Sequence, residues 1–587
     1  MKLLMDAAGI RTPGCKQGIL MYNNTPMTIG GRMRQILILT ALIVLTASGC
    51  HKSDSEARKH DGCDASVDSG NAGTDGDTDS DSDSDAGNDS DIDGDAGGDA
   101  AGNTDLNEGD LIWVKQAGGK AELPGSKDPG DAGYGIAVLD DGSFYVTGFF
   151  DGDATFGPGE INETLVRGIG FFIARYDPAG RLEWVRNSEP DADCKGYDIR
   201  VLPDDSVVVT GTFWNSVTFG RDESTETILT SKGWSDIFIA RYNSDGTLAW
   251  AKSAGGTDED HGTGISVLDN GSMIITGHYE ETATFGEKEA AQASVTSFGS
   301  EEIFIARYSP KGNLEWARSA GGSDTDIAKG IAVFPDGSFV ITGSFTNVAI
   351  FGMDDAAETH LATQGDHYCS NLFIARYNPD GTLVWAKSAQ GENDSQGNGL
   401  AASQDGSTLV TGYFGEGTVF GPEESGEITL KPADDLDIFV ARYNSDGTLA
   451  WVKSAGGDYD EAGNAIVLLS DDSFIVTGYF LANATFGTGE ANETMLLAPA
   501  FVTDIFVAGY NPDGTLTWAR NAGGPYRDDN DKTSGDRGHD LALLPDNGIL
   551  VTGEFWEEAV FGKGEANETT IVSGGHGNIF IAKFLLK

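Results

Sequence analysis

The sequence predicts an all-β fold made of seven copies of one unit, and three observations predict it. A tryptophan recurs every 66 to 71 residues, at Trp113, Trp184, Trp250, Trp316, Trp385, Trp451 and Trp518. A Thr-Gly pair, a Phe-Gly pair and a Phe-Ile/Val-Ala run each recur seven times with the same period. Short runs rich in Ile, Val, Phe and Tyr are separated by Asn-Gly and Asp-Gly turns, and no segment keeps a 3.6-residue period. A strand-based repeat of this length is typical of a β-propeller.

Each unit is predicted to contain four strands. In one copy these are residues 264–268, 272–279, 303–308 and 314–318. Tight turns between runs of β-branched and aromatic residues favour antiparallel hairpins. One unit is therefore one four-stranded antiparallel blade.

The order of strands at the two ends predicts how the ring closes. The repeat region opens with a fourth strand, residues 111–115, and ends with a third strand, residues 579–584. The N-terminal strand can complete the last blade and remove an exposed sheet edge. We therefore predict a single seven-bladed β-propeller over residues 111–587, closed by this strand.

The units also resemble a known bacterial repeat. Residues 141–150 and 471–480 carry an Asp-rich turn followed by a Val-Thr-Gly strand and an aromatic residue. This pattern is similar to the SBBP-type β-propeller repeat, and the resemblance covers residues 111–587. It implies a secreted or surface-exposed bacterial protein, and it brings no catalytic residues.

The N-terminal region predicts a membrane anchor. Residues 1–32 lack a signal pattern and are interpreted as an upstream extension of the gene model, because Met33 would open a well-formed signal peptide. The apolar run 36–47 has 12 residues, too few to span a bilayer. The end of segment 33–50, Ala47-Ser48-Gly49-Cys50, resembles a bacterial lipobox, which implies lipidation of Cys50 and a location in the cell envelope, at the outer membrane or surface of a Gram-negative bacterium. Ordinary cleavage near Gly49, leaving Cys50 as a free thiol, is the alternative.

Residues 51–110 are predicted to be a disordered acidic linker. They carry 19 acidic and 3 basic side chains and almost no large apolar residue, so they cannot bury enough surface to offset the entropy of ordering. The whole chain has 38 Lys and Arg against 92 Asp and Glu, a net charge of −54. Nucleic acid is excluded as a partner, because binding it needs a basic surface. We expect a monomer.

Residues that recur in every blade are expected to serve the blade, so a ligand site must break the repeat. Two tryptophans do so in matching places, Trp214 and Trp556, each directly after a recurring Phe. Aromatic faces at a propeller mouth can stack on sugars or apolar side chains. Both are therefore candidate ligand contacts on the face with the longer connections, with packing against neighbouring loops as the alternative.

The loops between the fourth and first strands carry a repeated acidic pattern. Alternate oxygen ligands suit a hard cation, so calcium is the cofactor we consider, without requiring one. The candidate ligands are Asp258, Asp260, Asp324, Asp326, Asp458 and Asp460. The alternative is a solvated acidic rim.

The sequence gives no support for an enzyme. It contains no His-Glu-x-x-His zinc helix and no Gly-x-Ser-x-Gly nucleophile elbow. We expect a lipid-anchored, non-catalytic binding or adhesion scaffold with a protein or glycan ligand on its long-loop face. The alternatives are an extracellular glycan-active hydrolase or lyase that uses carboxylates of that face, and a purely structural envelope protein.

Overall fold

The computed structural model describes residues 106–120, 130–188, 193–364, 369–499, 502–525, 535–574 and 577–587. Within them the chain forms strands and turns and no helix. No helix in this part of the chain has the length and apolar character to cross a bilayer. Cys50, segments 1–32 and 33–50, and most of segment 51–110 lie outside the described residues.

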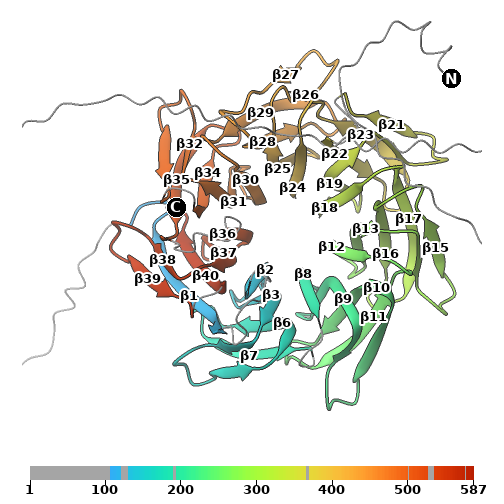
Figure 1. The fold of residues 1–587 in the computed structure, drawn as a ribbon, viewed down its shortest axis with the longest axis horizontal. Helices are drawn as coiled ribbons and strands as arrows, with labels where there is room; N and C mark the ends of the chain where they lie inside the picture. Colours follow the sequence, from blue (N-terminus) through green and yellow to red (C-terminus); the bar gives the residue numbers. More distant parts are fainter. Residues whose placement is uncertain are drawn as a thin grey trace, which may run out of the picture. The chain divides into compact units, whose positions relative to one another are not determined.

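The strands form seven four-stranded antiparallel sheets around a central axis, which confirms the predicted fold (Figure 1). Written from the inner to the outer strand, blade 1 is β2 (Ala132–Val138), β3 (Phe144–Asp151), β6 (Ile169–Tyr176) and β7 (Leu182–Asn187). Blade 2 is β8 (Cys194–Val201), β9 (Val207–Phe219), β10 (Thr227–Tyr242) and β11 (Leu248–Ala254). Blade 3 is β12 (Asp260–Val267), β13 (Met273–Tyr279), β16 (Glu302–Tyr308) and β17 (Leu314–Gly322). Blade 4 is β18 (Asp326–Val333), β19 (Phe339–Thr346), β22 (Ser370–Tyr377) and β23 (Leu383–Ser388).

The remaining blades repeat this order. Blade 5 is β24 (Ser395–Ala402), β25 (Thr408–Phe414), β28 (Asp437–Tyr443) and β29 (Leu449–Ala455). Blade 6 is β30 (Ala462–Leu468), β31 (Phe474–Leu481), β34 (Thr503–Tyr510) and β35 (Leu516–Ala522). Blade 7 is β36 (Arg537–Leu543), β37 (Gly548–Phe555), β40 (Asn578–Leu585) and β1 (Leu111–Lys120).

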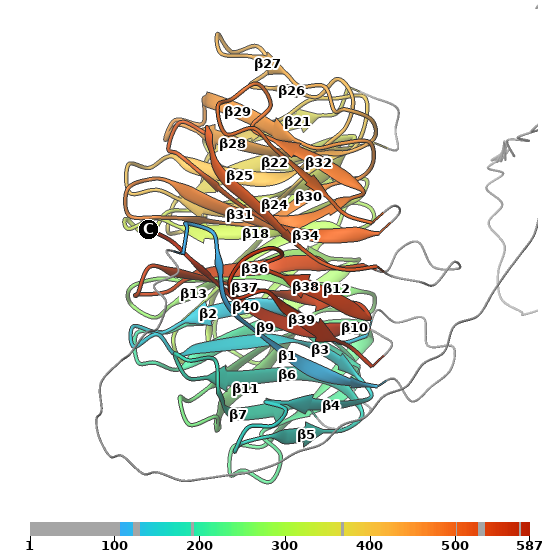
Figure 2. The same cartoon turned by 90° about the vertical axis from the view of Figure 1, so that its left-hand side faces the viewer.

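The ring closes as predicted. β1 pairs antiparallel with β40, with Gln116 opposite Phe580. Before β1, Gly109 N–H donates to Leu585 O at 2.8 Å, so the two ends of the propeller meet in blade 7 (Figure 2). The N-terminal strand thus supplies the outer strand of the last blade and leaves no open edge there.

A second, smaller hairpin lies between the second and third strands of each blade, a feature that the sequence analysis treated as a connection. These hairpins are β4 (Asp153–Phe156) with β5 (Thr164–Val166), β14 (Thr282–Phe285) with β15 (Ala293–Thr296), β20 (Val348–Phe351) with β21 (Thr359–Ala362), β26 (Val419–Phe420) with β27 (Ile428–Thr429), β32 (Asn483–Phe486) with β33 (Thr494–Leu497), and β38 (Glu558–Phe561) with β39 (Thr569–Val572). In blade 2 the hairpin is continuous with β9 and β10. β4 also pairs with β1, and β20 with β17, so a hairpin clasps the outer strand of the preceding blade.

The recurring residues hold neighbouring blades together. The described core divides into seven apolar clusters, each drawing on two adjacent blades. Each Trp ring lies against a turn glycine of the next blade; a Cβ added to Gly246 would lie 3.0 Å from the Trp184 ring, and its φ of +83° also favours glycine. Gly109 reproduces this seat for Trp518. The structure therefore confirms a structural role for the recurring Trp.

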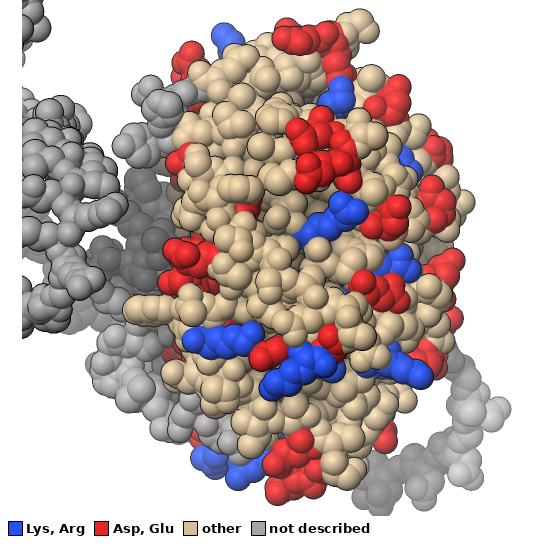
Figure 3. Space-filling view, turned by 90° about the vertical axis from the view of Figure 1, so that its right-hand side faces the viewer, with Lys and Arg blue, Asp and Glu red and all other residues tan. Residues whose placement is uncertain are grey.

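The recurring acid three residues after each Phe-Gly glycine also links blades. Glu424 Oε2 accepts a hydrogen bond from Leu449 N–H of its own blade at 2.8 Å, while Oε1 binds Lys387 of the preceding blade, also at 2.8 Å. Six such ion pairs occur in the described structure. Basic and acidic side chains accordingly lie side by side on the flank shown in Figure 3.

Candidate functional site

The seven inner strands enclose a central channel with a volume of about 1010 Å³. One residue of each inner strand sits in a β-bulge, where the pairing with the second strand shifts by one residue. Going round from blade 1 to blade 7, the bulge residues are Tyr134, Tyr197, Thr263, Lys329, Asn398, Asn464 and His539, and all seven line the channel. Bulges are devices that re-aim a side chain. Here they present five kinds of side chain (Tyr, Thr, Lys, Asn and His) at one structurally equivalent position.

The residues that flank each bulge residue are small for a steric reason. The first is Gly or Ala, and the second is Gly, Ala or Asp. A Cβ added to Gly397 would lie 2.1 Å from Oγ1 of Thr342, the threonine of the preceding blade's Thr-Gly pair. The first neighbour is thus restricted to Gly or Ala, whereas the bulge side chain varies from blade to blade. This recurring small residue before the bulge is the signal that the sequence analysis missed.

Three of the bulge side chains are bonded to the next blade. Thr263 Oγ1 donates to Ala328 O at 2.7 Å, Asn398 Nδ2 to Gly463 O at 3.0 Å, and Asn464 Nδ2 to Gly538 O at 2.8 Å. Each of these hydrogen bonds uses a side-chain donor that would otherwise be available to a ligand. Tyr197, Lys329 and His539 make no such link in the described structure.

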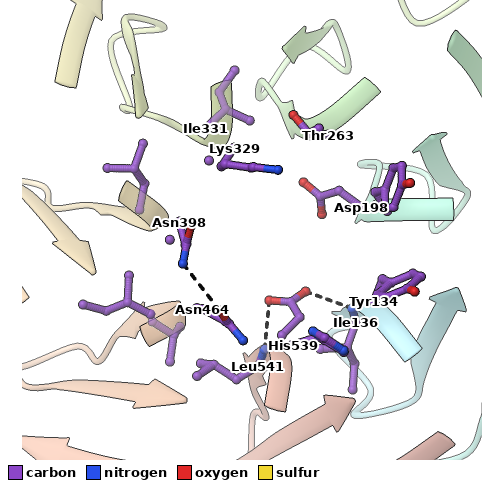
Figure 4. Close-up of a pocket in the computed structure, with 18 of the residues that line it drawn as sticks. Tyr134, Ile136, Asp198, Thr263, Lys329, Ile331, Asn398, Asn464, His539 and Leu541 are labelled. Atoms are coloured by element: carbon purple, nitrogen blue, oxygen red, sulfur yellow. Dashed lines mark hydrogen bonds between the residues drawn. The ribbon is translucent and has the colours of Figure 1, made fainter. Parts of the chain in front are cut away.

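Two channel carboxylates are also tied to neighbouring blades. Asp198 Oδ2 accepts a hydrogen bond from Ile265 N–H at 2.8 Å, and Asp540 Oδ2 accepts one from Ile136 N–H at 3.0 Å. Figure 4 labels Asp198 and Ile136 in the channel lining. Asp198 also pairs with Arg200 at 2.5 Å. Burial raises the pKa of Asp540 to about 6, against the opposing effect of Arg200.

A histidine pair lies at the channel mouth, which we define by the first residues of the inner strands and their partners on the second strands. His261 and His278 are directly paired, and their rings stack with centroids 4.8 Å apart. Burial is the main cause that lowers the pKa of both, and the positive charge of Lys329 contributes to each. Both rings are therefore neutral at neutral pH.

The two predicted tryptophan contacts have different surroundings. Trp214 is half-buried at the mouth, where its ring meets His261 edge-on at 6.1 Å and Lys195 Nζ lies 5.9 Å from its centroid. Trp556 is only 8 % exposed, and its backbone N–H donates to Asp536. The structure thus leaves Trp214 accessible beside the channel and packs Trp556 into the blade. Most of the long loop after Pro525 lies outside the described residues.

The six predicted calcium ligands divide into two environments. Asp260 and Asp326 are fully buried, and their carboxylates accept backbone N–H groups of Gly256 and Gly322. Burial raises the pKa of each to about 8. Each of the other four has some exposed surface: Asp258, Asp324, Asp458 and Asp460. Asp324 and Asp458 accept hydrogen bonds from Asn347 and Asn483. The described residues contain no group of three or more His, Cys, Asp or Glu arranged for a metal ion, and calcium binding stays a prediction.

The buried aspartates belong to carboxyl pairs between blades. Four blade boundaries each hold two buried carboxyl groups that repel one another when ionised: Asp236 with Asp260, Glu302 with Asp326, Asp437 with Glu461, and Asp504 with Asp536. Burial raises the pKa of Glu461 to about 9 and that of Asp437 to about 6. Asp437 Oδ1 and Glu461 Oε1 are buried and have no hydrogen-bond partner in the described structure. A single proton held between these two oxygens would satisfy both.

No protein-family model matches the chain. Among curated proteins, it is 23 % identical over 366 residues to an uncharacterised WD repeat-containing protein of Acanthamoeba polyphaga mimivirus, covering 53 % of this chain and 26 % of that protein. It is also 23 % identical over 359 residues to regulatory protein FlaEY of Caulobacter vibrioides, covering 59 % of this chain and 35 % of that one. The chain thus spans about a quarter to a third of the length of these relatives.

Among solved structures, Sqt1 of Chaetomium thermophilum is 9 % identical with a TM-score of 0.32, and the alignment covers 82 % of this chain and all of that one. Exo-inulinase of Aspergillus awamori is 11 % identical with a TM-score of 0.25, covering 81 % and 98 %. Likenesses this weak say nothing about activity. The WD-repeat relative fits a propeller, and a seven-bladed β-propeller is the fold of this chain.

Proposed function

We propose that this protein is a non-catalytic binding module of the SBBP-repeat type, anchored in the cell envelope through Cys50, and that its ligand enters the central channel. The observation that carries the proposal is the position of the variation. Inside a scaffold whose Trp, Gly, Thr and acidic residues recur seven times, seven equivalent bulge positions carry five kinds of side chain into one cavity of about 1010 Å³. Largely pre-formed cavities with a few convergent polar groups are the usual ligand sites of proteins.

Retention of the purified protein on a panel of immobilised envelope and matrix polysaccharides tests this proposal. The wild type should be retained by at least one of them, and Tyr197→Ala should lose that retention while keeping the wild-type Tm. Leu165→Ala is the matched control. Leu165 is 46 % exposed on a peripheral hairpin, so the substitution removes side-chain area far from the channel. Equal retention of Tyr197→Ala and wild type, or no retention at all, would contradict a channel site.

The anchor has a separate test. Cells that express the wild type should incorporate radiolabelled palmitate into the protein, and Cys50→Ser should abolish the label. Label that persists in Cys50→Ser would remove the lipoprotein part of the proposal and leave the channel site unaffected.

A glycan-active enzyme is the second candidate, and one observation favours it: Asp198 and Asp540 bring two carboxyl groups into the channel. Their hydrogen bonds to the backbone of the next blade favour a structural role instead. Release of reducing ends from the retained polysaccharide, lost in Asp540→Asn, would establish the enzyme and overturn the non-catalytic proposal.

A further inference from the structure

The channel is asymmetric, and one side of it is an aromatic wall. Tyr134, Tyr197 and His539 come from the bulges of blades 1, 2 and 7, which are consecutive round the ring. The ring of Tyr134 lies 5.6 Å from that of Tyr197 and 5.1 Å from that of His539. These side chains combine a flat apolar face with a polar atom. Such surfaces suit the CH face and hydroxyl groups of a sugar ring.

A cation faces this wall. Lys329, the bulge residue of blade 4, reaches into the channel from the side opposite Tyr134 and His539 (Figure 4). It makes no hydrogen bond or ion pair in the described structure, although most basic residues of the outer strands are paired with acids. Burial lowers the pKa of its ammonium group, and the nearby Glu301 offsets only part of that effect. An incompletely compensated cation inside a cavity is a functional signal, because desolvating it costs free energy.

A second polar atom near Lys329, a ring nitrogen of His278, lacks a hydrogen-bond partner among the described residues. His278 lines the channel and is 7 % exposed, and its Nδ1 has no hydrogen-bond partner in the described structure. Its Nε2 lies 3.6 Å from Glu301 Oε1. Buried polar atoms are normally satisfied. The sector formed by blades 3 and 4 therefore offers an ammonium group and an imidazole nitrogen to a bound molecule.

Resting on the proposed binding function, we propose that the channel binds an acidic saccharide, with a sugar ring against Tyr134, Tyr197 and His539 and its carboxylate on Lys329. The protein carries a net charge of −54, so long-range attraction does not favour an anion. Selectivity must come from this one unpaired cation at close range. The volume of the channel lies at the upper end of the range of about 300–1,000 Å³ for ligand pockets, which suits several linked sugar units rather than one.

Isothermal titration calorimetry of the purified protein tests the inference. The probes are hexamers of galacturonic, mannuronic and glucuronic acid, each compared with its carboxyl-reduced neutral counterpart at the same salt concentration. At least one acidic hexamer should bind about tenfold more tightly than its neutral counterpart, as expected for one charge-assisted contact. Lys329→Met should reduce the acidic affinity to the neutral value and leave neutral binding unchanged, and Tyr197→Ala should weaken both.

Lys311→Met is the matched control, because Lys311 is exposed on a turn outside the channel lining. The affinity of a variant is compared with that of the wild type only where the two proteins have the same Tm, so that loss of folding is separated from loss of a contact. No binding of any acidic hexamer, tighter binding of hexaglutamate than of every hexuronate, or unchanged acid preference in Lys329→Met would overturn the inference. Neutral binding that depends on Tyr197 without any acid preference would overturn it and leave the proposed channel function standing. Hexamer binding that neither Tyr197→Ala nor Lys329→Met changes would remove both.

Discussion

Replacing Glu461 by Gln should stabilise the folded protein at alkaline pH, because it removes one carboxyl from a buried pair. Glu461 is 1 % exposed and lies against Asp437, and burial raises its pKa from an ordinary value of 4.5 to about 9. A folded-state pKa above the unfolded value means that the folded state binds the proton more tightly. Stability is therefore lost as the pH rises through the interval between the two values.

The magnitude follows from the two pKa values. Between pH 6.5 and 8.5 the unfolded chain keeps this carboxyl ionised while the folded protein keeps it protonated, which costs about 2.5 kcal/mol of unfolding free energy over the window, at ~1.4 kcal/mol per pH unit. Gln has the shape of the protonated acid and can donate to Asp437. The variant should lose this share of the pH dependence.

Urea unfolding at pH 6.5, 7.5 and 8.5 measures the effect. Burial lowers the pKa of His261 and His278, so both add a small rise of stability with pH, and this rise is the same in wild type and Glu461→Gln. The difference between the two profiles therefore reports Glu461. Asp140→Asn is the control, since Asp140 is exposed and makes no hydrogen bond in the described structure. Parallel pH profiles of wild type and Glu461→Gln, or a wild-type stability that rises with pH, would refute the argument for buried protonated pairs.

Three further predictions concern the scaffold and its loops. Gly246→Ala should destabilise the protein by about 1–3 kcal/mol more than Gly159→Ala, because both glycines have positive φ but only the first lies against a Trp ring; equal changes in urea midpoint would contradict this. Deletion of residues 1–118 should abolish cooperative thermal unfolding, because blade 7 loses its outer strand. A cooperative transition near the wild-type Tm would contradict closure by β1. Millimolar calcium should raise the Tm if Asp258, Asp324 and Asp458 bind it, and the same Tm in EDTA would remove that proposal.

Much of the fold could be predicted from the sequence because it depends on local signals repeated seven times. The Trp, Thr-Gly and Phe-Gly residues mark contacts that every blade makes, and the strand order at the two ends fixes the closure. The small hairpins were missed because their strands are two to four residues long, as in Val419–Phe420. Runs this short are not distinguishable from a connection by alternation alone.

The site was harder to predict, for reasons that particular residues make clear. Alternate spacing suggested that Asp258 and Asp260 share one ion, but Asp260 is the first residue of an inner strand and turns into the blade boundary. Lys329 and His539 gave no signal because each occurs once, far from the other in sequence. Only the ring brings them into one channel, and the flanking small residues gain meaning once the bulges are seen.

The way in which β1 closes the ring decides how the propeller would respond to force. The start of β1 lies beside the end of β40, as the hydrogen bond between Gly109 and Leu585 shows. Tension applied between these two adjacent ends would peel β1 from that end, breaking its ladder one hydrogen bond at a time rather than all together in shear. The far end of β1, where Gly118 pairs with Thr155 of blade 1, would be the last to let go. Under tension between these two ends, the strand that completes the propeller is therefore the first strand to separate from it.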